Sequence, residues 1–297
     1  MNIAITGANS SVGINLLAHI SKHDDINVIA CVRSERASSS LPSLPQVKPR
    51  IISYDDVKDL ALALEGIDCI IHLAGILIEN KGADYETANV KATAAVVNAA
   101  KQVGVKQFVF ISVVGANKNS TNRYFKSKGD AEKLVSESGL AATIIRTPIL
   151  IGPGTAGATS IVWAASQGRP RLLGGGNYTM RPLDVDDLST AILNRCNESF
   201  EGVSIHELAG PEPILYSELV KRVARLMDKE VSIGTIPIWL AKLVAAITSR
   251  LKGGMSPTVI DVITMGEVVQ NNADKALGIS LTPLTTTLGK ILTNKKK

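Results

Sequence analysis

A tyrosine and a lysine near the middle of the chain are spaced to act together. Tyr124 and Lys128 are four residues apart in a segment with helical periodicity, so both side chains project from one face of a helix. A nearby ammonium group lowers the pKa of a phenol, and such a phenol can exchange a proton with a substrate. The same spacing also fits a chance surface pair. We interpret the two residues as a candidate proton-transfer pair.

The first apolar run of the chain ends in a turn that suits a phosphate group. Residues 3–13 read IAITGANSSVG, which predicts a buried strand, a glycine-bearing turn and the beginning of a helix. Gly7 lets the backbone turn sharply, and a helix that begins near Ser11 offers free N–H groups and the positive end of its dipole. Ser10 replaces the middle glycine of a Gly-x-x-Gly-x-x-Gly turn, so an ordinary strand–turn–helix is the alternative. The pattern favours a dinucleotide pyrophosphate site.

The end of the second apolar run indicates which dinucleotide fits. A site that prefers NAD has a carboxylate there for the ribose hydroxyls. In this chain the run ends in Arg33 and Ser34, and the first acid is Glu35. A guanidinium group suits a 2′-phosphate because it makes paired, charge-assisted hydrogen bonds. We therefore expect NADP(H) to be favoured over NAD(H), with a solvated surface arginine as the alternative.

Composition limits the class of protein. The 297 residues are 45% hydrophobic and 20% charged, which is typical of a globular protein with a sizeable core. The formal net charge is +5, and residues 295–297 supply three of those charges, so the excess is too small to argue for nucleic acid. The four histidines have no metal-ligand spacing, so we expect no metal site. The sequence predicts neither a membrane-spanning helix nor a signal peptide.

The cysteines point to a reducing compartment. Cys31, Cys69 and Cys196 lie far apart in the sequence, and two of them fall inside apolar runs. Buried free thiols are the expected state, which favours a cytoplasmic location.

The elements that must position these residues alternate between strand and helix. Strands are predicted at Asn2–Thr6, Asn27–Cys31, Arg50–Ser53, Cys69–Leu73, Gln107–Ser112 and Ala142–Arg146. Helices are predicted between them, at Ser11–His23, Val57–Leu64, Tyr85–Val103 and Tyr124–Ser138. Short strands that are apolar on both faces are typical of a parallel sheet covered by helices. The rhythm predicts an α/β fold, a Rossmann-type doubly wound parallel sheet with a smaller C-terminal lobe.

The alternation loosens after Gly152-Pro153-Gly154. We therefore expect an NAD(P)-binding domain over residues 1–154. Residues 155–297 are expected to form mostly a smaller substrate or interaction lobe, with some segments returning to the sheet.

Nine spaced motifs occur in a recognisable order. They are Thr6-Gly7-Ala8 with Gly13, Asp55, His72-Leu73-Ala74-Gly75, Asn89-Val90-Lys91-Ala92-Thr93, Phe108-Val109-Phe110-Ile111-Ser112, Tyr124-x-x-x-Lys128, Arg146-Thr147-Pro148, Gly152-Pro153-Gly154 and Asp184-Val185-Asp186-Asp187-Leu188. This series resembles the extended and atypical short-chain dehydrogenase/reductase superfamily over nearly the whole chain. Within it, the chain is most similar to the atypical branch that contains the NADPH-binding accessory subunit of respiratory complex I and its bacterial relatives.

The resemblance implies roles for individual residues. Those implied to line the pyrophosphate are Gly7, Asn9, Ser10, Ser11, Val12 and Gly13. Asp55 and Asp56 are implied to lie beside the adenine, and Ala74 and Gly75 beside the adenosine ribose. Asn89 belongs to the implied cofactor site, Lys128 is implied to bind the nicotinamide ribose, and Thr147 and Pro148 are implied to flank the carboxamide.

The resemblance also exposes a departure from the catalytic pattern. Tyr124 and Lys128 match the proton-transfer pair of the superfamily, but the usual catalytic serine falls on Val114 when counted from Ser112. A valine cannot polarise a carbonyl group. Ser112 substitutes for it only if the loop is repositioned.

Arg181 is a weak candidate for binding substrate. It resembles the arginine that holds a diphosphate in nucleotide-sugar enzymes, although Asp184 replaces a histidine that is common nearby. The alternative is a structural ion pair with Asp184, Asp186 or Asp187.

A nearly all-apolar segment, residues 237–251, is too short to span a bilayer. Seven basic and two acidic residues lie between Lys221 and Lys252, so a peripheral contact with an anionic membrane on its inner face is one expectation. A core helix that closes the substrate pocket is the other.

Three functions follow from these observations. The first is an NADP(H)-dependent oxidoreductase acting on a small carbonyl or quinone-like substrate. The second is a nucleotide-binding structural or assembly subunit of a membrane respiratory complex. The third is a nucleotide-sugar epimerase or dehydratase. The sequence leaves the substrate and the oligomeric state open.

Overall fold

The computed structural model describes residues 1–252 and 254–293. Its centre is a seven-stranded sheet in the order β11-β6-β5-β4-β1-β2-β3, and every neighbouring pair is parallel. The strands are β1 (Asn2–Thr6), β2 (Asn27–Val32), β3 (Val47–Ile51), β4 (Cys69–His72), β5 (Gln107–Val113), β6 (Ala142–Thr147) and β11 (Val203–Glu207). The predicted doubly wound sheet is confirmed.

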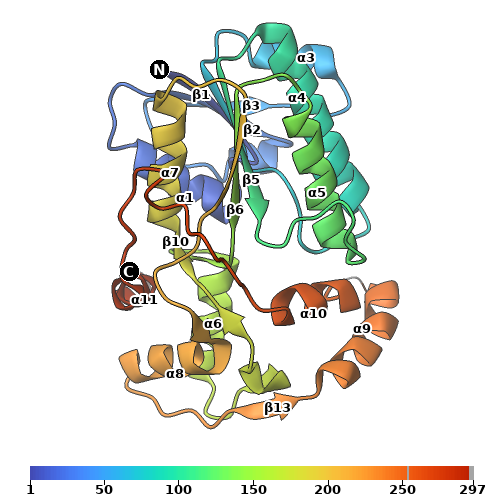
Figure 1. The fold of residues 1–297 in the computed structure, drawn as a ribbon, viewed down its shortest axis with the longest axis vertical. Coiled ribbons are helices and arrows are strands. Elements are labelled where there is room, and N and C mark those ends of the chain that lie inside the picture. The colour runs from blue at the N-terminus through green and yellow to red at the C-terminus, as the bar shows by residue number, and fades with distance from the viewer. Residues whose placement is uncertain (253, 294–297) are drawn as a thin grey trace.

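Helices cover both faces of the sheet (Figure 1). One face carries α1 (Ser11–Ile20) and α7 (Val185–Asn197), and the other carries α3 (Val57–Ala63), α4 (Ala92–Val103) and α5 (Arg123–Ser136). Alternate residues of β1 serve both cores, because Ile3 and Ile5 join the α1–α7 cluster and Ala4 joins the opposite one. This two-sided burial explains the continuous apolar runs in the sequence.

Two predicted elements differ from those observed. The third strand spans Val47–Ile51 instead of Arg50–Ser53, because it is an edge strand whose exposed residues include Lys48, Pro49 and Arg50. The predicted helix over Tyr85–Val103 is a π-helix, η1 (Glu86–Lys91), followed by α4. The short helix α2 (Glu35–Ser38) follows β2.

The second half of the chain builds a smaller lobe below the sheet (Figure 1) and also returns to the sheet with α7 and β11. Its helices are α6 (Ala156–Ser166), α8 (Tyr216–Leu226), α9 (Ile238–Lys252), α10 (Pro257–Thr264) and α11 (Leu284–Thr293), with a short 3-10 turn, η2 (Gly174–Gly176). Three two-stranded ladders pair β7 (Leu150–Ile151) with β10 (Leu183–Asp184), β9 (Thr179–Met180) with β12 (Ile214–Leu215), and β8 (Arg171–Leu173) with β13 (Gly234–Ile236).

The lobe has its own apolar core between α6, α8 and α11, which includes Ile161, Leu219 and Leu288. Among the helices that the structure describes, none combines the length and apolar character needed to cross a bilayer.

Candidate functional site

The turn between β1 and α1 lies at the carboxyl end of the sheet, at the point where the strand order reverses. Gly7 has φ +74°, and a Cβ atom there would lie 2.9 Å from the backbone nitrogen of Ala74. A Cβ atom at Gly13 would lie 2.3 Å from the carbonyl oxygen of Ala8. Both positions therefore require glycine, as a turn pressed against a helix N-terminus and a neighbouring strand does.

Ser10 has a defined task in this turn. It is the N-cap of α1, and its Oγ accepts a hydrogen bond of 3.0 Å from the N–H of Gly13. The N–H groups of Ser11 and Val12, in the first turn, have no acceptor four residues earlier within the helix. Ser10, in place of the expected glycine, therefore caps the N-terminus of α1. The positive end of the helix dipole lies at the same end of the helix, where the pyrophosphate is expected to bind.

The adenosine side of the predicted site is open. Arg33 follows β2 and is exposed, and Asp55 is also exposed. The Asp56 carboxylate caps α3, because it accepts hydrogen bonds of 3.0 Å from the N–H groups of Lys58 and Asp59. Of the two neighbouring aspartates, Asp55 is therefore the one whose carboxylate is not used as a helix cap.

Tyr54 is a residue of this region that the sequence analysis missed. Burial raises the pKa of its phenol, and the positive charge of Arg33 acts in the opposite direction. Tyr54 is half-buried and precedes Asp55 in the chain. Its position directly before the predicted Asp55 was the available signal.

Asn89 fastens the loop that follows β4. Its Oδ1 accepts from the N–H of Ile76 at 2.8 Å, and its Nδ2 donates to the carbonyl oxygen of Ile76 at 3.2 Å and to Ser127 Oγ at 2.9 Å. A Cβ atom at Gly75 would lie 3.1 Å from Asn89 Oδ1. Asn89 therefore holds the loop of Ala74 and Gly75 against α5, and its amide group is occupied by protein partners.

Lys128 brings a buried positive charge to the same place. Its Nζ donates to the carbonyl oxygen of Ile111 at 2.9 Å, lies 4.3 Å from the ring centroid of Phe110, and would be 3.9 Å from a Cβ atom at Gly75. Burial lowers the pKa of Lys128 to about 8, and the Glu132 carboxylate opposes that shift. The ammonium group is thus held at the carboxyl ends of β4 and β5.

A buried histidine connects the elements beneath this charge. His72 lies between two hydroxyl groups, with Nδ1 2.6 Å from Thr6 Oγ1 and Nε2 3.0 Å from Thr93 Oγ1. Burial lowers the pKa of His72 to about 3, and Lys128 acts in the same direction, so its imidazole is neutral. The network ties β1 and β4 to α4.

Tyr124 lies in an aromatic cluster at the beginning of α5. Its ring centroid is 5.7 Å from that of Tyr85 and 5.7 Å from that of Phe125, and Val113 and Val262 pack against the three rings. Burial raises the pKa of Tyr124, and Tyr85 adds to the shift. The side chain therefore stays protonated at neutral pH.

The strand end beside Tyr124 offers apolar side chains. Val113 packs against the tyrosine cluster, whereas Val114, the position expected to replace the catalytic serine, packs with Ala209 and Val269. Ser112 Oγ is buried and has no hydrogen-bond partner among the described residues. Neither valine provides a hydroxyl group, so Ser112 is the serine of β5 that remains as a candidate.

The end of β6 lies beside the end of β5 and forms the next part of the predicted cofactor site. Thr147 is buried, and its Oγ1 donates to the carbonyl oxygen of Ser112 at 3.3 Å. Pro148 follows and is half-buried. The predicted carboxamide-flanking pair therefore adjoins the end of β5.

Arg181 does not form the ion pair that was the structural alternative to binding a diphosphate. Its Nε donates to the carbonyl oxygen of Gly210 at 2.9 Å and its NH1 to that of Val269 at 3.0 Å, so it braces backbone segments. The expected ion pair with an aspartate of 184–187 is wrong, because Lys290 pairs with Asp184 and Asp186.

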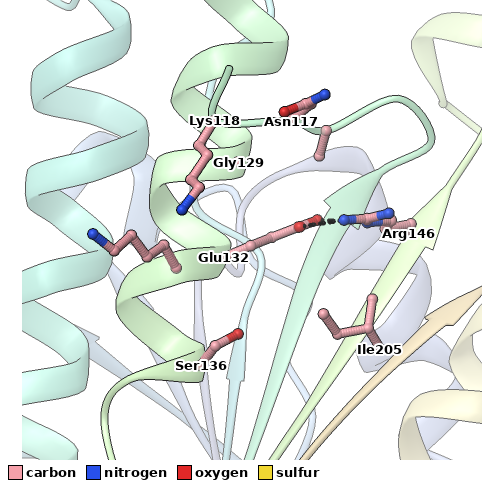
Figure 2. A pocket seen from close by; sticks show the side chains of 9 residues that line it. Asn117, Lys118, Gly129, Glu132, Ser136, Arg146 and Ile205 are labelled. Atoms are coloured by element: carbon pink, nitrogen blue, oxygen red, sulfur yellow. Dashed lines mark hydrogen bonds and ion pairs between the residues drawn. The ribbon is translucent and has the colours of Figure 1, made fainter. Parts of the chain in front are cut away.

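A polar cavity lies beside α5, lined among others by Gly129, Glu132 and Arg146. Figure 2 shows Glu132 of α5 pointing toward Arg146 of β6. Arg146 donates to both carboxylate oxygens of Glu132, at 3.0 and 2.7 Å, which raises the pKa of Arg146. A Cβ atom at Gly129 would lie 2.2 Å from the backbone nitrogen of Lys118. These contacts fix the helix that carries Tyr124 and Lys128.

Known proteins of similar sequence perform different tasks. The UDP-glucose 4-epimerase of Vibrio cholerae is 26% identical over 82% of this chain and 80% of its own length. The mitochondrial NADH dehydrogenase [ubiquinone] 1 alpha subcomplex subunit 9 of Arabidopsis thaliana is 24% identical over 94% of this chain and 73% of its own.

Solved structures share the fold. MoeE5 in complex with UDP-glucuronic acid and NAD has a TM-score of 0.76 at 19% identity and covers 100% of both chains. An NADPH-dependent quinone oxidoreductase from Escherichia coli has a TM-score of 0.70 at 20% identity, over 97% of this chain and 98% of its own.

The family itself is defined by a sequence model described as NAD(P)H-binding, which matches residues 7–171. The matched residues run from Gly7 through the lysine and tyrosine of α5 into the lobe, and they confirm the resemblance inferred from the motifs. The chain belongs to this NAD(P)H-binding family.

Proposed function

We propose that the protein is an NADP(H)-dependent oxidoreductase acting on a small carbonyl or quinone-like substrate. The observation that carries the proposal is the buried ammonium group of Lys128, held by the Ile111 carbonyl beside Gly75. A buried positive charge costs free energy unless it is paired or hydrogen-bonded, and the ammonium group has three donors, of which one is used by the Ile111 carbonyl oxygen. At the carboxyl ends of β4 and β5, its other donors would bind the hydroxyl groups of a ligand.

The cradle of Gly7 and Gly13 fits a dinucleotide, because side chains there would fill the space against Ala74 and Ala8. The first N–H groups of α1 would bind the pyrophosphate, and Arg33 would bind a 2′-phosphate. When bound, the nicotinamide group supplies a hydride. The chain's own residues orient it, with Lys128 on the ribose and Thr147 and Pro148 beside the carboxamide.

Tyr124 is the proposed proton donor. Its hydroxyl group remains protonated at neutral pH because burial raises its pKa, so the proton to be given is present. The raised pKa differs from the lowered pKa expected from the sequence and makes the phenol a weaker acid, because burial outweighs any effect of Lys128. Ser112 Oγ is buried without a partner, so it would reach a substrate only if the end of β5 were repositioned. The apolar side chains of Val113 and Val262 around the tyrosine favour an apolar substrate.

The test is turnover of NADPH with a panel of quinones and aldehydes. Tyr124→Phe should abolish turnover and leave nucleotide affinity nearly unchanged, because only the proton-bearing hydroxyl is removed. Tyr85→Phe is the matched control, since its ring is in the same cluster but its hydroxyl donates to the Leu77 carbonyl at 2.7 Å. Unchanged turnover in Tyr124→Phe would show that the pair is not catalytic.

A second candidate is a nucleotide-binding subunit or assembly factor of a membrane respiratory complex. The apolar residues at positions 113 and 114 favour it, because they leave Tyr124 without the usual hydroxyl partner on the loop. The Arabidopsis relative carries the name of such a subunit. This function predicts a nucleotide that copurifies with the protein and no turnover with any substrate.

A nucleotide-sugar epimerase is the third candidate, suggested by the Vibrio relative. Arg181 argues against it, because its Nε and NH1 donors are occupied by backbone carbonyl oxygens instead of facing a diphosphate. We also propose a cytoplasmic location, which the free, buried cysteines support.

A further inference from the structure

The helix α9 has its apolar side chains on the outside. Trp239, Leu243 and Ile247 are 68%, 56% and 59% exposed, and Leu240 and Val244 are exposed beside them. These five positions repeat at helical spacing and form one face; we call them the α9 apolar face. A contiguous apolar face of this kind marks an interaction site.

The opposite side of α9 is already used. Ala245 is buried, and Lys242 forms an ion pair with Asp261 of α10. The α9 apolar face therefore points away from the protein, and in Figure 1 α9 is the outermost helix on its side of the lobe. The alternative of a core helix is wrong for this face.

The helix α10 lies between α9 and the candidate active site. Asn122 at the beginning of α5 donates to the carbonyl oxygen of Thr258 at 3.1 Å, and Val262 packs against the cluster that contains Tyr124. Gly115 packs closely against Met265, the residue after α10, since a Cβ atom at Gly115 would lie 2.9 Å from the terminal carbon of Met265. The α9–α10 hairpin thus packs, through α10, against the cluster that contains Tyr124.

The charge of the segment around α9 indicates whether a second copy of the chain or an anionic surface covers the α9 apolar face. Between Glu230 and Asp261 the sequence has three basic residues, Lys242, Arg250 and Lys252, and no acidic residue; the ion pair with Asp261 neutralises Lys242, so Arg250 and Lys252 supply the positive charge of the segment. A second copy of the chain would bring like charges together, which disfavours self-association. An anionic surface complements the segment instead.

The chemistry of the face distinguishes lipid from protein. Protein interfaces contain about one hydrogen bond per 100–200 Å², whereas the side chains of the α9 apolar face offer a single donor, the indole N–H of Trp239, and no acceptor. Its one exposed hydroxyl neighbour, Thr248, donates back to the Val244 carbonyl at 3.0 Å. Acyl chains require no hydrogen bonds, and tryptophan is favoured at the level of the headgroups.

We propose that α9 lies in the surface of an anionic membrane, with its apolar face among the acyl chains. The cluster that contains Tyr124 then lies on the protein side of the hairpin, against α10. The 15 residues of α9 span roughly 22 Å as a helix. This is shorter than the hydrocarbon core of about 30 Å, so the helix lies on the bilayer and does not cross it. The docking is independent of the reaction proposed for Tyr124.

The experiment is cosedimentation of the full chain with vesicles of phosphatidylcholine alone and of phosphatidylcholine mixed with phosphatidylglycerol. We expect binding to the anionic vesicles at low salt and release as salt rises. Trp239→Ser with Leu243→Ser should weaken binding by roughly tenfold or more. The matched control is Trp163→Ser with Leu226→Ser. These two residues are 63% and 52% exposed on α6 and α8, so this variant should bind the vesicles like the wild type.

A second measurement does not depend on the folding of the double variant. The chain has two tryptophans, so Trp163→Phe leaves Trp239 as the only indole fluorophore. Its emission should shift to the blue with anionic vesicles and be quenched by brominated acyl chains. Absent binding, equal binding to neutral vesicles, or an unchanged emission overturns the proposal. A concentration-dependent dimer that Leu243→Ser abolishes would assign the face to a second copy instead.

Discussion

At the scale of single residues, the candidate site depends on charges placed at the ends of strands. Two of them support predictions. Arg33 lies exposed at the end of β2, and Lys128 lies buried at the ends of β4 and β5.

Arg33 should determine the choice between nicotinamide cofactors. We expect NADPH to bind more tightly than NADH by about tenfold or more, because a guanidinium group makes one to two charge-assisted hydrogen bonds to the 2′-phosphate. Calorimetric titration of the wild type and Arg33→Ala with both nucleotides measures this. Arg36→Ala, an exposed arginine three residues on, is the control and should keep the preference. Equal affinities in the wild type contradict the prediction.

Lys128 should make nucleotide binding depend on pH. Its pKa is lowered to about 8 by burial. Below that pH the ammonium group is charged and donates to the ribose, whereas above it the neutral amine donates weakly. Affinity should therefore fall as pH rises through about 8. Titrations across this range measure it, and Lys128→Met should bind weakly with no such dependence. His72, whose pKa is about 3, stays neutral throughout and cannot produce the effect.

Some residue roles were predictable and others were not. The four-residue spacing of Tyr124 and Lys128 is a local pattern, so the sequence reveals it. The occupation of Arg181 by Gly210 and Val269 depends on segments 29 and 88 residues away. No spacing rule contains that information.

At the scale of elements, the junction of β1 and α1 is the most constrained. Gly13→Ala would force a Cβ atom to 2.3 Å from the Ala8 carbonyl oxygen, so α1 must move. We expect a loss of about 1–3 kcal/mol in the free energy of unfolding and much weaker nucleotide binding. Urea denaturation and titration measure these. Gly168→Ala is the control, because no atom lies within 4 Å of its added Cβ. Equal effects at both positions would refute the packing argument.

Strands whose residues are buried could be predicted from the sequence, and a strand with exposed residues could not. β1 has the predicted bounds because Ile3, Ala4 and Ile5 are all buried. β3 is shifted because an edge strand with exposed Lys48 and Arg50 carries no apolar signal.

At the scale of the whole molecule, a half-buried carboxylate, that of Glu267, fastens the lobe near the end of β6. The Glu267 carboxylate accepts from the N–H of Ile149 at 2.7 Å and from that of Arg181 at 2.8 Å. Burial raises its pKa. Because the pKa is raised in the folded state, stability falls as pH rises from the ordinary carboxyl range to the raised value, although the two hydrogen bonds of the carboxylate oppose this loss.

Glu267→Gln should test this fastening. The amide can accept only one of the two hydrogen bonds, so one buried N–H loses its partner at a cost of about 1–3 kcal/mol. Urea denaturation measures the change. Glu230→Gln, on an exposed residue of the lobe, should leave stability unchanged. A Glu267→Gln protein as stable as the wild type would show that the contact does not hold the lobe.

The seventh strand of the sheet has a consequence for synthesis of the protein. As the ribosome releases the chain, the first six strands emerge before α7 and β11 exist. Until about residue 207 is free, β6 presents an unpaired edge, and the face of the sheet beside α1 lacks the cover of Leu188 and Ile192. Such nascent chains expose an edge and an apolar face that invite aggregation. The nucleotide-binding half is therefore completed only after most of the chain has been translated.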